Sequence, residues 1–411
     1  MAEQPLRFVH AADLRLGEPP SGLAEIPDHV RGDLLDAAYH AAERVFDVTL
    51  EESAGFLVLS GGVFGRSGCS ARTFAFLAEQ FGRLAERGVT VYWADGPFVA
   101  GGASPYEFEW PDNVCIFPPG STGEFSFQRQ GFCLARLLGQ SGDRVSLNRV
   151  DLPRDARGCF TIVVLHERDE ADEASLLAID YVASGGQADR RTSSMGSTVL
   201  HWPGTPQGRR AQEEGAHGCT IVEADVDGRP HLRFQATDSL RWHTAQQVVR
   251  ESTTRAQLEA RLHEHVQELK ATADGRQLLV NWHVTGSEHL VPRVNRATLA
   301  AELLAWFRRQ FGLARPTLWS NSVVVECGDA TERFQHEGDT ILGEFLRELG
   351  ALVADPAKEL DLGVAPRATE AGALARTGAR LRIADAHWRE RVLKLAAALG
   401  TELLGGEEAS A

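Results

Sequence analysis

The chain has 411 residues, of which 43% are hydrophobic and 24% charged, and its formal net charge is -15 at pH 7. This length predicts two or three domains with ordinary cores, and the acidic balance argues against a general affinity for nucleic acid, which needs a basic surface. No apolar run approaches the roughly 20 residues that span a bilayer, and the first residues lack the pattern of a secretion signal, so we expect a cytoplasmic protein.

The first part of the chain alternates predicted strands and helices. Short apolar runs at 7–12, 56–60 and 89–93 predict strands, and apolar residues at spacings of three and four predict helices around 34–46 and 73–86. Strands and helices in this order imply right-handed crossovers and a parallel sheet.

Strands dominate the next part of the chain. Strand-like runs lie at 114–117, 132–136, 160–165, 181–184, 198–202, 219–224 and 231–235. Helices early and strands late predict two stacked sheets flanked by helices. The expected fold is therefore a four-layer α/β/β/α sandwich.

A domain boundary is expected near residue 245. Beyond it, Thr254 and Gln257 form a candidate capping box at the start of a helix. A strand at 277–283, a helix at 297–311 and a strand at 322–326 complete a small α/β unit. We predict a first domain over 1–245, a small α/β capping domain over 246–335, and a C-terminal helical region over 336–411.

The C-terminal region is predicted to hold two amphipathic helices joined by a flexible linker. The first helix carries the apolar stripe Ile341, Leu342, Phe345, Leu346 and Leu349. The second carries the stripe Trp388, Val392, Leu395 and Leu399. Residues 352–380 are rich in Ala, Gly and Pro and predict the linker. The second stripe either docks on a partner protein or packs on this chain's own core.

The six cysteines form no CxxC pair, which is typical of neither a disulfide framework nor a zinc site. Buried structural thiols are expected at these positions, which are Cys69, Cys115, Cys133, Cys159, Cys219 and Cys327.

Residues 6–240 resemble the SbcD/YhaO-like DNA-repair exonucleases, a branch of the calcineurin-like metallophosphoesterase superfamily. The resemblance begins with FVHAADLRLG, which is similar to the family's opening motif. Five further segments follow in the family's order: VLSGGVFG, VYWADGPFV, VVLHE, DYVASGGQAD and WPGTPQGRR. The resemblance implies the family's fold.

The resemblance also implies where the metal ligands should be, and most are replaced. Enzymes of this kind use two divalent ions about 4 Å apart, held by carboxylates, amides and histidines. Asp13 and His166 match ligand positions. The other positions carry Arg15, Gly62, Gly65, Gly96, Pro97, Phe98, Gly186 and Ala188. The resemblance therefore implies the fold and argues against the activity, with no catalytic residue and no bound metal.

Arg15 places a permanent cation where the family has a histidine ligand. Its guanidinium either pairs with Asp13 and excludes a divalent ion, or points to solvent. Two arginine pairs, Arg190/Arg191 and Arg209/Arg210, flank the same cleft, where they either contact phosphate or are solvated.

Three functions remain open. The preferred hypothesis is a non-catalytic, structural or regulatory subunit that binds a Rad50-like or YhaN-like coiled-coil ATPase in DNA repair or DNA metabolism, with the Trp388 stripe as docking element. Such a subunit would reach DNA through the complex, not bind a membrane, and form either a homodimer or a heterodimer with an active paralogue. The second is a weak or altered exonuclease or phosphoesterase holding one Mn or Mg ion by Asp13, His166 and His201. The third is a DNA-binding module without chemistry.

Overall fold

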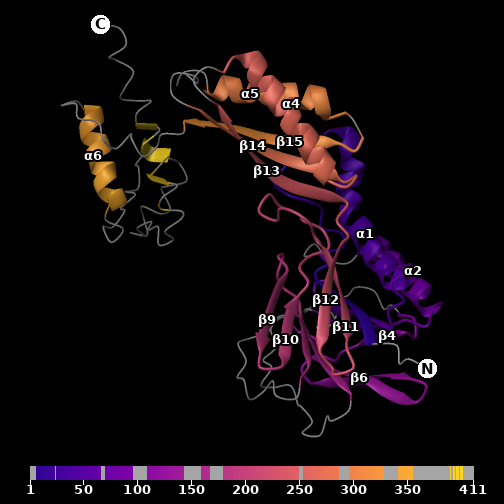
Figure 1. Ribbon diagram of the computed structural model, residues 1–411. Coiled ribbons are helices and arrows are strands. Elements are labelled where there is room, and N and C mark those ends of the chain that lie inside the picture. The colour runs from indigo at the N-terminus through magenta and orange to yellow at the C-terminus, as the bar shows by residue number, and fades with distance from the viewer. Residues whose placement is uncertain are drawn as a thin grey trace, which may run out of the picture. The chain divides into compact units, whose positions relative to one another are not determined.

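The computed structural model describes residues 6–23, 25–65, 70–95, 109–142, 159–166, 179–249, 253–286, 296–313, 315–327 and 341–354, and part of 389–400 (Figure 1). The chain forms two compact units. The first comprises Met1–Ala245, Leu262–Trp282 and Leu303–Val323, and the second comprises Gln246–Arg261, His283–Glu302 and Val324–Ala411. The predicted domain limits of 1–245, 246–335 and 336–411 stay predictions.

A six-stranded sheet forms the centre of the first unit, in the order β12-β11-β1-β2-β3-β4. The strands β1 to β4 are parallel neighbours, whereas β11 runs antiparallel to β1 and β12 antiparallel to β11. Their bounds are β1 Leu6–Ala11, β2 Phe56–Ser60, β3 Thr90–Ala94, β4 Val114–Ile116, β11 Gly218–Ala224 and β12 Pro230–Ala236. The strands predicted in these regions, and the parallel pairing of the first three, are confirmed.

Helices α1 (Asp28–Glu51) and α2 (Ala71–Ala85) share a core with this sheet. Ser70 caps α2 by accepting a hydrogen bond from the Thr73 N–H at 3.2 Å, which satisfies one of the free donors of the first turn. The apolar faces of both helices are buried through Val45 and Phe46 of α1 and Phe74, Leu77, Phe81 and Leu84 of α2. Leu35, which the spacing placed on the same stripe of α1, is 50% exposed.

The second sheet has the order β5-β6-β7-β8-β10-β9, with β6, β7, β8 and β10 parallel. Its strands are β5 Gly123–Arg129, β6 Phe132–Gln140, β7 Phe160–Leu165, β8 Tyr181–Ser184, β9 Arg191–Met195 and β10 Thr198–Trp202. The sequence missed β5 and β9. Both are edge strands with largely polar, exposed residues, so neither shows a continuous apolar run.

The two sheets pack against each other through large side chains. Phe8 of β1 stacks on Phe56 of β2 with ring centroids 4.8 Å apart and meets Tyr181 of β8 edge-on at 5.5 Å. Ile162 and Val164 of β7 belong to the same buried cluster. The chain is thus a mixed α/β protein, as predicted. The four-layer arrangement, with helices on the outer face of each sheet, stays a prediction.

A third sheet contains β13 (Leu240–Val249), β14 (Gln277–Gly286) and β15 (Leu318–Cys327). The accompanying helices are α4 (Arg255–Thr272) and α5 (Arg296–Phe311). β13 was not predicted, and it runs through residue 245, where the sequence suggested a boundary. The capping box is confirmed, because the Thr254 N–H donates to Gln257 Oε1 at 2.9 Å and the Gln257 N–H donates to Thr254 Oγ1 at 3.3 Å.

The described part of the tail shows which residues of α6 (Ile341–Ala354) are covered. Leu346 and Leu349 of α6 pack against Leu393 and Ala397, and all four are buried. α6 extends past residue 352, where the linker was predicted to begin. Most of that linker lies outside the described residues, as does Trp388. Within the described residues, no helix is long and apolar enough to cross a membrane.

Candidate functional site

The loops after β1 and β2 are joined at the carboxyl end of the first sheet, where open α/β sheets commonly bind ligands. The Asp13 N–H donates to the Gly61 carbonyl at 2.7 Å, and the Arg15 N–H donates to the Gly62 carbonyl at 2.8 Å. Asp13 and Arg15 both adopt positive φ, at 53° and 49°. Such a conformation is uncommon outside glycine. Here both residues lie in one short loop, and their side chains contact each other.

The carboxylate of Asp13 is held on both oxygens. Its Oδ1 lies 2.7 Å from Nη2 of Arg15, and its Oδ2 accepts a hydrogen bond from the Gly186 N–H at 2.6 Å. The side chain is only 1% exposed. Burial raises the pKa of Asp13, and the charge of Arg15, the nearby His166 and the Gly186 hydrogen bond each oppose that rise. Arg15 therefore pairs with Asp13, as one of the two sequence hypotheses had it.

Gly61 and Gly62 leave no room for side chains beside this pair. A Cβ at Gly62 would lie 2.1 Å from Asp13 Oδ1, and a Cβ at Gly61 would lie 2.0 Å from His166 Nδ1. Both glycines also have positive φ, which is 88° at Gly61 and 64° at Gly62. Gly62 occupies the position where the family resemblance implies a bridging aspartate. The space that such a side chain would need is filled by the Asp13 carboxylate.

His166 completes this cluster from the second sheet. It follows β7 and is 8% exposed, and its Nδ1 is buried without a hydrogen-bond partner among the described residues. Its backbone carbonyl accepts a hydrogen bond from the Gly185 N–H at 2.8 Å. The structure therefore brings Asp13 and His166 together at one end of the two sheets.

Of the remaining substituted positions, two lie among the described residues and three do not. Ala188 lies in the turn after β8, where its carbonyl accepts a hydrogen bond from the Thr205 N–H at 3.0 Å. Gly65 lies against the loop after β1, because a Cβ there would be 2.8 Å from Glu18 Cβ. The segment with Gly96, Pro97 and Phe98 lies outside the described residues.

A buried histidine pair lies between the two sheets. His10 is hydrogen-bonded through Nδ1 to the Tyr181 hydroxyl at 2.8 Å and through Nε2 to Ser60 Oγ at 2.7 Å. The ring centroids of His10 and His201 are 5.7 Å apart. Burial lowers the pKa of His10 well below its usual value, and His201 lowers it further. Sequence reasoning did not find this network, because its members come from distant strands.

His201 was a candidate ligand in the single-ion hypothesis, but both of its ring nitrogens are engaged. Nδ1 lies 2.8 Å from Thr192 Oγ1, and Nε2 lies 2.8 Å from Thr220 Oγ1. Burial and the charge of Arg190 lower the pKa of His201 to about 4. The ring is a buried, neutral, doubly hydrogen-bonded group, so it does not serve as an ion ligand in this arrangement.

The four candidate phosphate-binding arginines differ in their surroundings. Arg209 is 8% exposed and pairs with Glu18 at 2.8 Å and Glu213 at 3.8 Å. Arg210 is largely exposed and lies 3.8 Å from the same Glu213. Two carboxylates thus already neutralise Arg209.

The other two arginines are exposed and lie over aromatic rings. Arg190 lies 5.0 Å from the ring centroid of Phe234, and Arg191 lies 5.5 Å from that of Trp202. Phosphate binding by Arg190, Arg191 and Arg210 stays a prediction.

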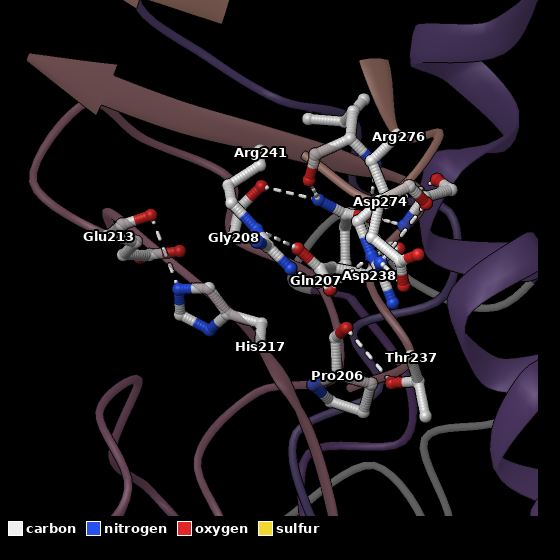
Figure 2. Close-up of polar contacts among 12 residues, drawn as sticks. Pro206, Gln207, Gly208, Glu213, His217, Thr237, Asp238, Arg241, Asp274 and Arg276 are labelled. Carbon is white, nitrogen blue, oxygen red and sulfur yellow. Dashed lines mark hydrogen bonds and ion pairs between the residues drawn. The ribbon is translucent and has the colours of Figure 1, made fainter. Parts of the chain in front are cut away.

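A polar network fixes the loop that carries Arg209 (Figure 2). Gln207 accepts hydrogen bonds through Oε1 from the Ser239 N–H at 3.0 Å, and donates through Nε2 to the Leu240 carbonyl at 2.7 Å. In the same loop, His217 Nδ1 lies 3.0 Å from Thr205 Oγ1. The loop is therefore tied to the start of β13, which holds Arg209 in place against Glu18.

Asp238 anchors the same region, and Figure 2 shows it between two arginines. Its buried carboxylate lies 2.8 Å from Nε of Arg241 and 2.9 Å from Nε of Arg276. Asp274 accepts a further bond from Arg276 at 2.9 Å. A buried charge with two partners is costly to disturb, so this network gives the neighbouring loop a fixed position.

Asp13, Arg15, Gly62 and His166, the described residues at this end of the sheets, do not by themselves fit a two-metal centre. Arg15 and the Gly186 N–H hold both oxygens of Asp13, and no side chain fits at Gly62. Within the described part of the chain, no group of three or more His, Cys, Asp or Glu side chains is placed to hold a metal ion. The described residues present a guanidinium paired with a buried carboxylate, beside an imidazole whose buried Nδ1 has no hydrogen-bond partner among them.

No protein-family model matches the chain. Over 255 residues it is 28% identical to the uncharacterized metallophosphoesterase YhaO of Bacillus subtilis (strain 168), a match that covers 58% of this chain and 62% of that protein. The match thus spans less than two thirds of that relative's length. It shows distant homology, and the chain is a metallophosphoesterase-like protein related to YhaO.

Several solved structures are also similar in part. TT1561 of Thermus thermophilus has a TM-score of 0.34 at 11% identity, over 57% of this chain and 100% of that chain. The phosphoesterase Yfce from E. coli has a TM-score of 0.26 at 14% identity, over 56% and 93%. Vacuolar Protein Sorting 29 from Cryptosporidium parvum has 0.25 at 18%, over 56% and 97%. Because these scores are low, the relationship rests on the sequence match to YhaO.

Proposed function

We propose that this chain is a catalytically inactive, YhaO-type metallophosphoesterase-like subunit. It would act as a structural or regulatory partner of a Rad50-like or YhaN-like coiled-coil ATPase in DNA repair or DNA metabolism. In this proposal residues 1–245 have the four-layer sandwich of that family, followed by the small α/β capping domain.

The ion pair between Asp13 and Arg15 carries the proposal. The arginine stands at a position where the resemblance implies a histidine ligand, and its Nη2 lies 2.7 Å from the carboxylate that a metal would need. Two divalent ions about 4 Å apart repel each other strongly and require bridging and neutralising ligands. Here a permanent cation takes the place of one of those ions, and Gly62 supplies no bridge.

Manganese titration of the purified full-length chain tests the inactivity directly. We expect no two-ion binding by calorimetry and no release of nucleotides from double-stranded or single-stranded DNA with Mn²⁺ or Mg²⁺ present. Binding of two ions together with nuclease activity that Asp13→Asn abolishes would refute the proposal.

A second candidate function is a reduced, single-ion phosphoesterase. The observation in its favour is that Nδ1 of His166, close to the Asp13 carboxylate, has no hydrogen-bond partner in the part of the chain that the structure describes. The hydrogen bonds of His201 count against a third ligand from that side. Binding of one ion that His166→Ala removes and His201→Gln does not would favour this function over the first.

The partner ATPase is proposed from the tail. Leu395 and Leu399 of the predicted stripe are 53% and 55% exposed, which leaves apolar surface available to a partner. Because Trp388 lies outside the described residues, its place in the stripe stays a prediction. Co-purification with a long coiled-coil ATPase encoded beside this chain tests the partnership. Strong, salt-dependent binding of DNA by the chain alone would instead favour the DNA-binding module.

A further inference from the structure

Two thiols lie close together on neighbouring segments of the second sheet. Cys133 lies in β6, and Cys159 directly precedes β7. Both are unpaired and partly buried. The Sγ of Cys159 lies 3.3 Å from the Cys133 carbonyl oxygen, and the neighbouring Cys159 thiol, after burial, contributes to the raised pKa of Cys133. Residue spacing alone suggested only scattered, buried thiols and did not point to this pair.

A β-bulge explains why these thiols meet. Along the β5–β6 ladder, Phe127 pairs with Ala135 but Gln128 pairs with Cys133, so Leu134 has no opposite residue. Residues directly opposite each other point to the same face, and successive residues alternate. Phe127 and Gln128 point to opposite faces, and therefore Ala135 and Cys133 do as well.

The β6–β7 ladder places Cys159 on the same face as Cys133. Ala135 pairs with Phe160, so these two share a face, and the preceding residue, Cys159, points to the other one. Without the bulge, Cys133 would share the face of Ala135 and point away from Cys159. The extra residue at Leu134 thus brings the two thiols to a common face.

The spacing of the strands suits a covalent link. Neighbouring strands are about 4.8 Å apart, and the one-residue offset adds about 3.3 Å along the strand. These values put the two Cα atoms about 6 Å apart, near the commonest separation in disulfides. We propose that Cys133 and Cys159 form a thiol–disulfide site, which a peroxide oxidises to an intramolecular disulfide between β6 and β7.

The reaction balances with hydrogen peroxide as the oxidant. Burial raises the pKa of Cys133 to about 11, which keeps that thiol protonated at pH 7, so the first attack is assigned to Cys159. The Cys159 thiol loses its proton, the thiolate attacks one peroxide oxygen, and the O–O bond breaks. A sulfenic acid forms, and the hydroxide released takes up the proton lost by the thiol and leaves as water. The sulfur of Cys133 then attacks the sulfenic sulfur, the S–S bond forms, and the S–O bond breaks. The hydroxide released takes the Cys133 proton and leaves as water. The two thiols lose two electrons and two protons in total, and peroxide becomes two waters.

The test uses the full-length chain, reduced with dithiothreitol, desalted, and treated with hydrogen peroxide. Free thiols are then blocked with iodoacetamide, and peptides are mapped without reduction. We expect a Cys133–Cys159 cross-linked peptide, two fewer alkylated thiols per chain, a monomeric band on a non-reducing gel, and full reversal by dithiothreitol. Absence of that peptide, or a linkage of either cysteine to another chain, would overturn the proposal.

Matched variants separate this site from general thiol oxidation. Cys133→Ser and Cys159→Ser should each abolish the cross-link, whereas Cys115→Ser and Cys219→Ser should retain it, since neither belongs to the pair. A dimedone probe should label the sulfenic acid more strongly in Cys133→Ser, where Cys159 remains, than in Cys159→Ser. Equal or reversed labelling would overturn the assigned order of attack. Circular dichroism of each variant checks that the serine substitutions leave the fold intact.

Discussion

Oδ1 of Asp13 lies 2.7 Å from Nη2 of Arg15, two residues further along the same loop. The carboxylate is almost fully buried, and the guanidinium side chain is 20% exposed. A buried ion pair gains little over apolar packing, but removal of one partner leaves a buried charge without compensation. The pair therefore stabilises the loop after β1, and in the proposed function it is also the group that excludes a divalent ion.

We expect Arg15→Ala to lower the free energy of unfolding by about 3 kcal/mol at pH 8. The loss should be smaller at pH 5, because the pKa of Asp13 is already raised in the folded protein and rises further without Arg15. An acid with a raised folded-state pKa contributes stability at low pH and loses it as the pH rises through that value. Urea denaturation at both pH values measures the difference. The exposed pair Arg31 and Asp28 gives the control, since Arg31→Ala should change stability by less than about 1 kcal/mol. An Arg15→Ala effect no larger than this control would contradict the account.

A second prediction compares two glycines that both have positive φ. Gly22 has φ +83° and nothing within 4 Å of the place that a methyl group would take, whereas a Cβ at Gly62 would lie 2.1 Å from Asp13 Oδ1. Gly22→Ala should cost about 1 to 2 kcal/mol through the backbone alone, and Gly62→Ala clearly more. Thermal unfolding of both variants gives the comparison. Equal costs at the two glycines would show that the loop relaxes freely around Gly62.

By the same steric argument, Arg15→His with Gly62→Asp should not create a two-ion site in manganese titrations.

The buried histidines predict acid sensitivity. His201 has an ordinary pKa of 6.5 and a folded-state pKa of about 4, so the folded protein binds fewer protons than the unfolded chain between these values. Stability is therefore complete above pH 6.5 and falls as the pH drops, by about 3 kcal/mol for this one group at pH 4. His201→Gln should make the loss between pH 6.5 and 4 smaller by that amount. The exposed His40→Gln serves as a control and should leave the pH dependence unchanged. A pH dependence identical in wild type and His201→Gln would refute the assignment.

The tail gives a prediction that separates packing from docking. Leu393 is 3% exposed and packs with Leu346 and Leu349, whereas Leu395 is 53% exposed. Leu393→Ala should destabilise this cluster by about 2 to 3 kcal/mol, measured by hydrogen exchange of α6. Leu395→Ala and Leu399→Ala should leave that exchange unchanged but weaken binding to the proposed coiled-coil ATPase, measured by calorimetry. If Leu395→Ala and Leu399→Ala spare binding while Leu393→Ala abolishes it, the predicted stripe is not the docking face.

Elements whose pattern is local could be predicted from residue type and spacing. The apolar runs of β2, β7, β8 and β10 were predicted with the bounds that the structure shows, because strands buried in a parallel sheet are apolar along their whole length. The capping box at Thr254 depends on only four consecutive residues and was predicted for the same reason. The replacement of ligand positions by Arg15 and Gly62 was also readable, since it compares residue types at matching positions.

Features that depend on contacts between distant segments could not be predicted in this way and became clear only from the folded chain. The edge strand β9 lacked a signal because its residues are stabilised by pairing with β10 rather than by burial. The closed space at Gly62 exists because the Asp13 carboxylate, from another loop, fills it. The bulge at Leu134 turns Cys133 toward Cys159 through pairing with β5. The type and spacing of residues indicate which face of its own helix or strand a residue lies on. Hydrogen-bond register and steric room depend on two segments that come together only in the folded protein.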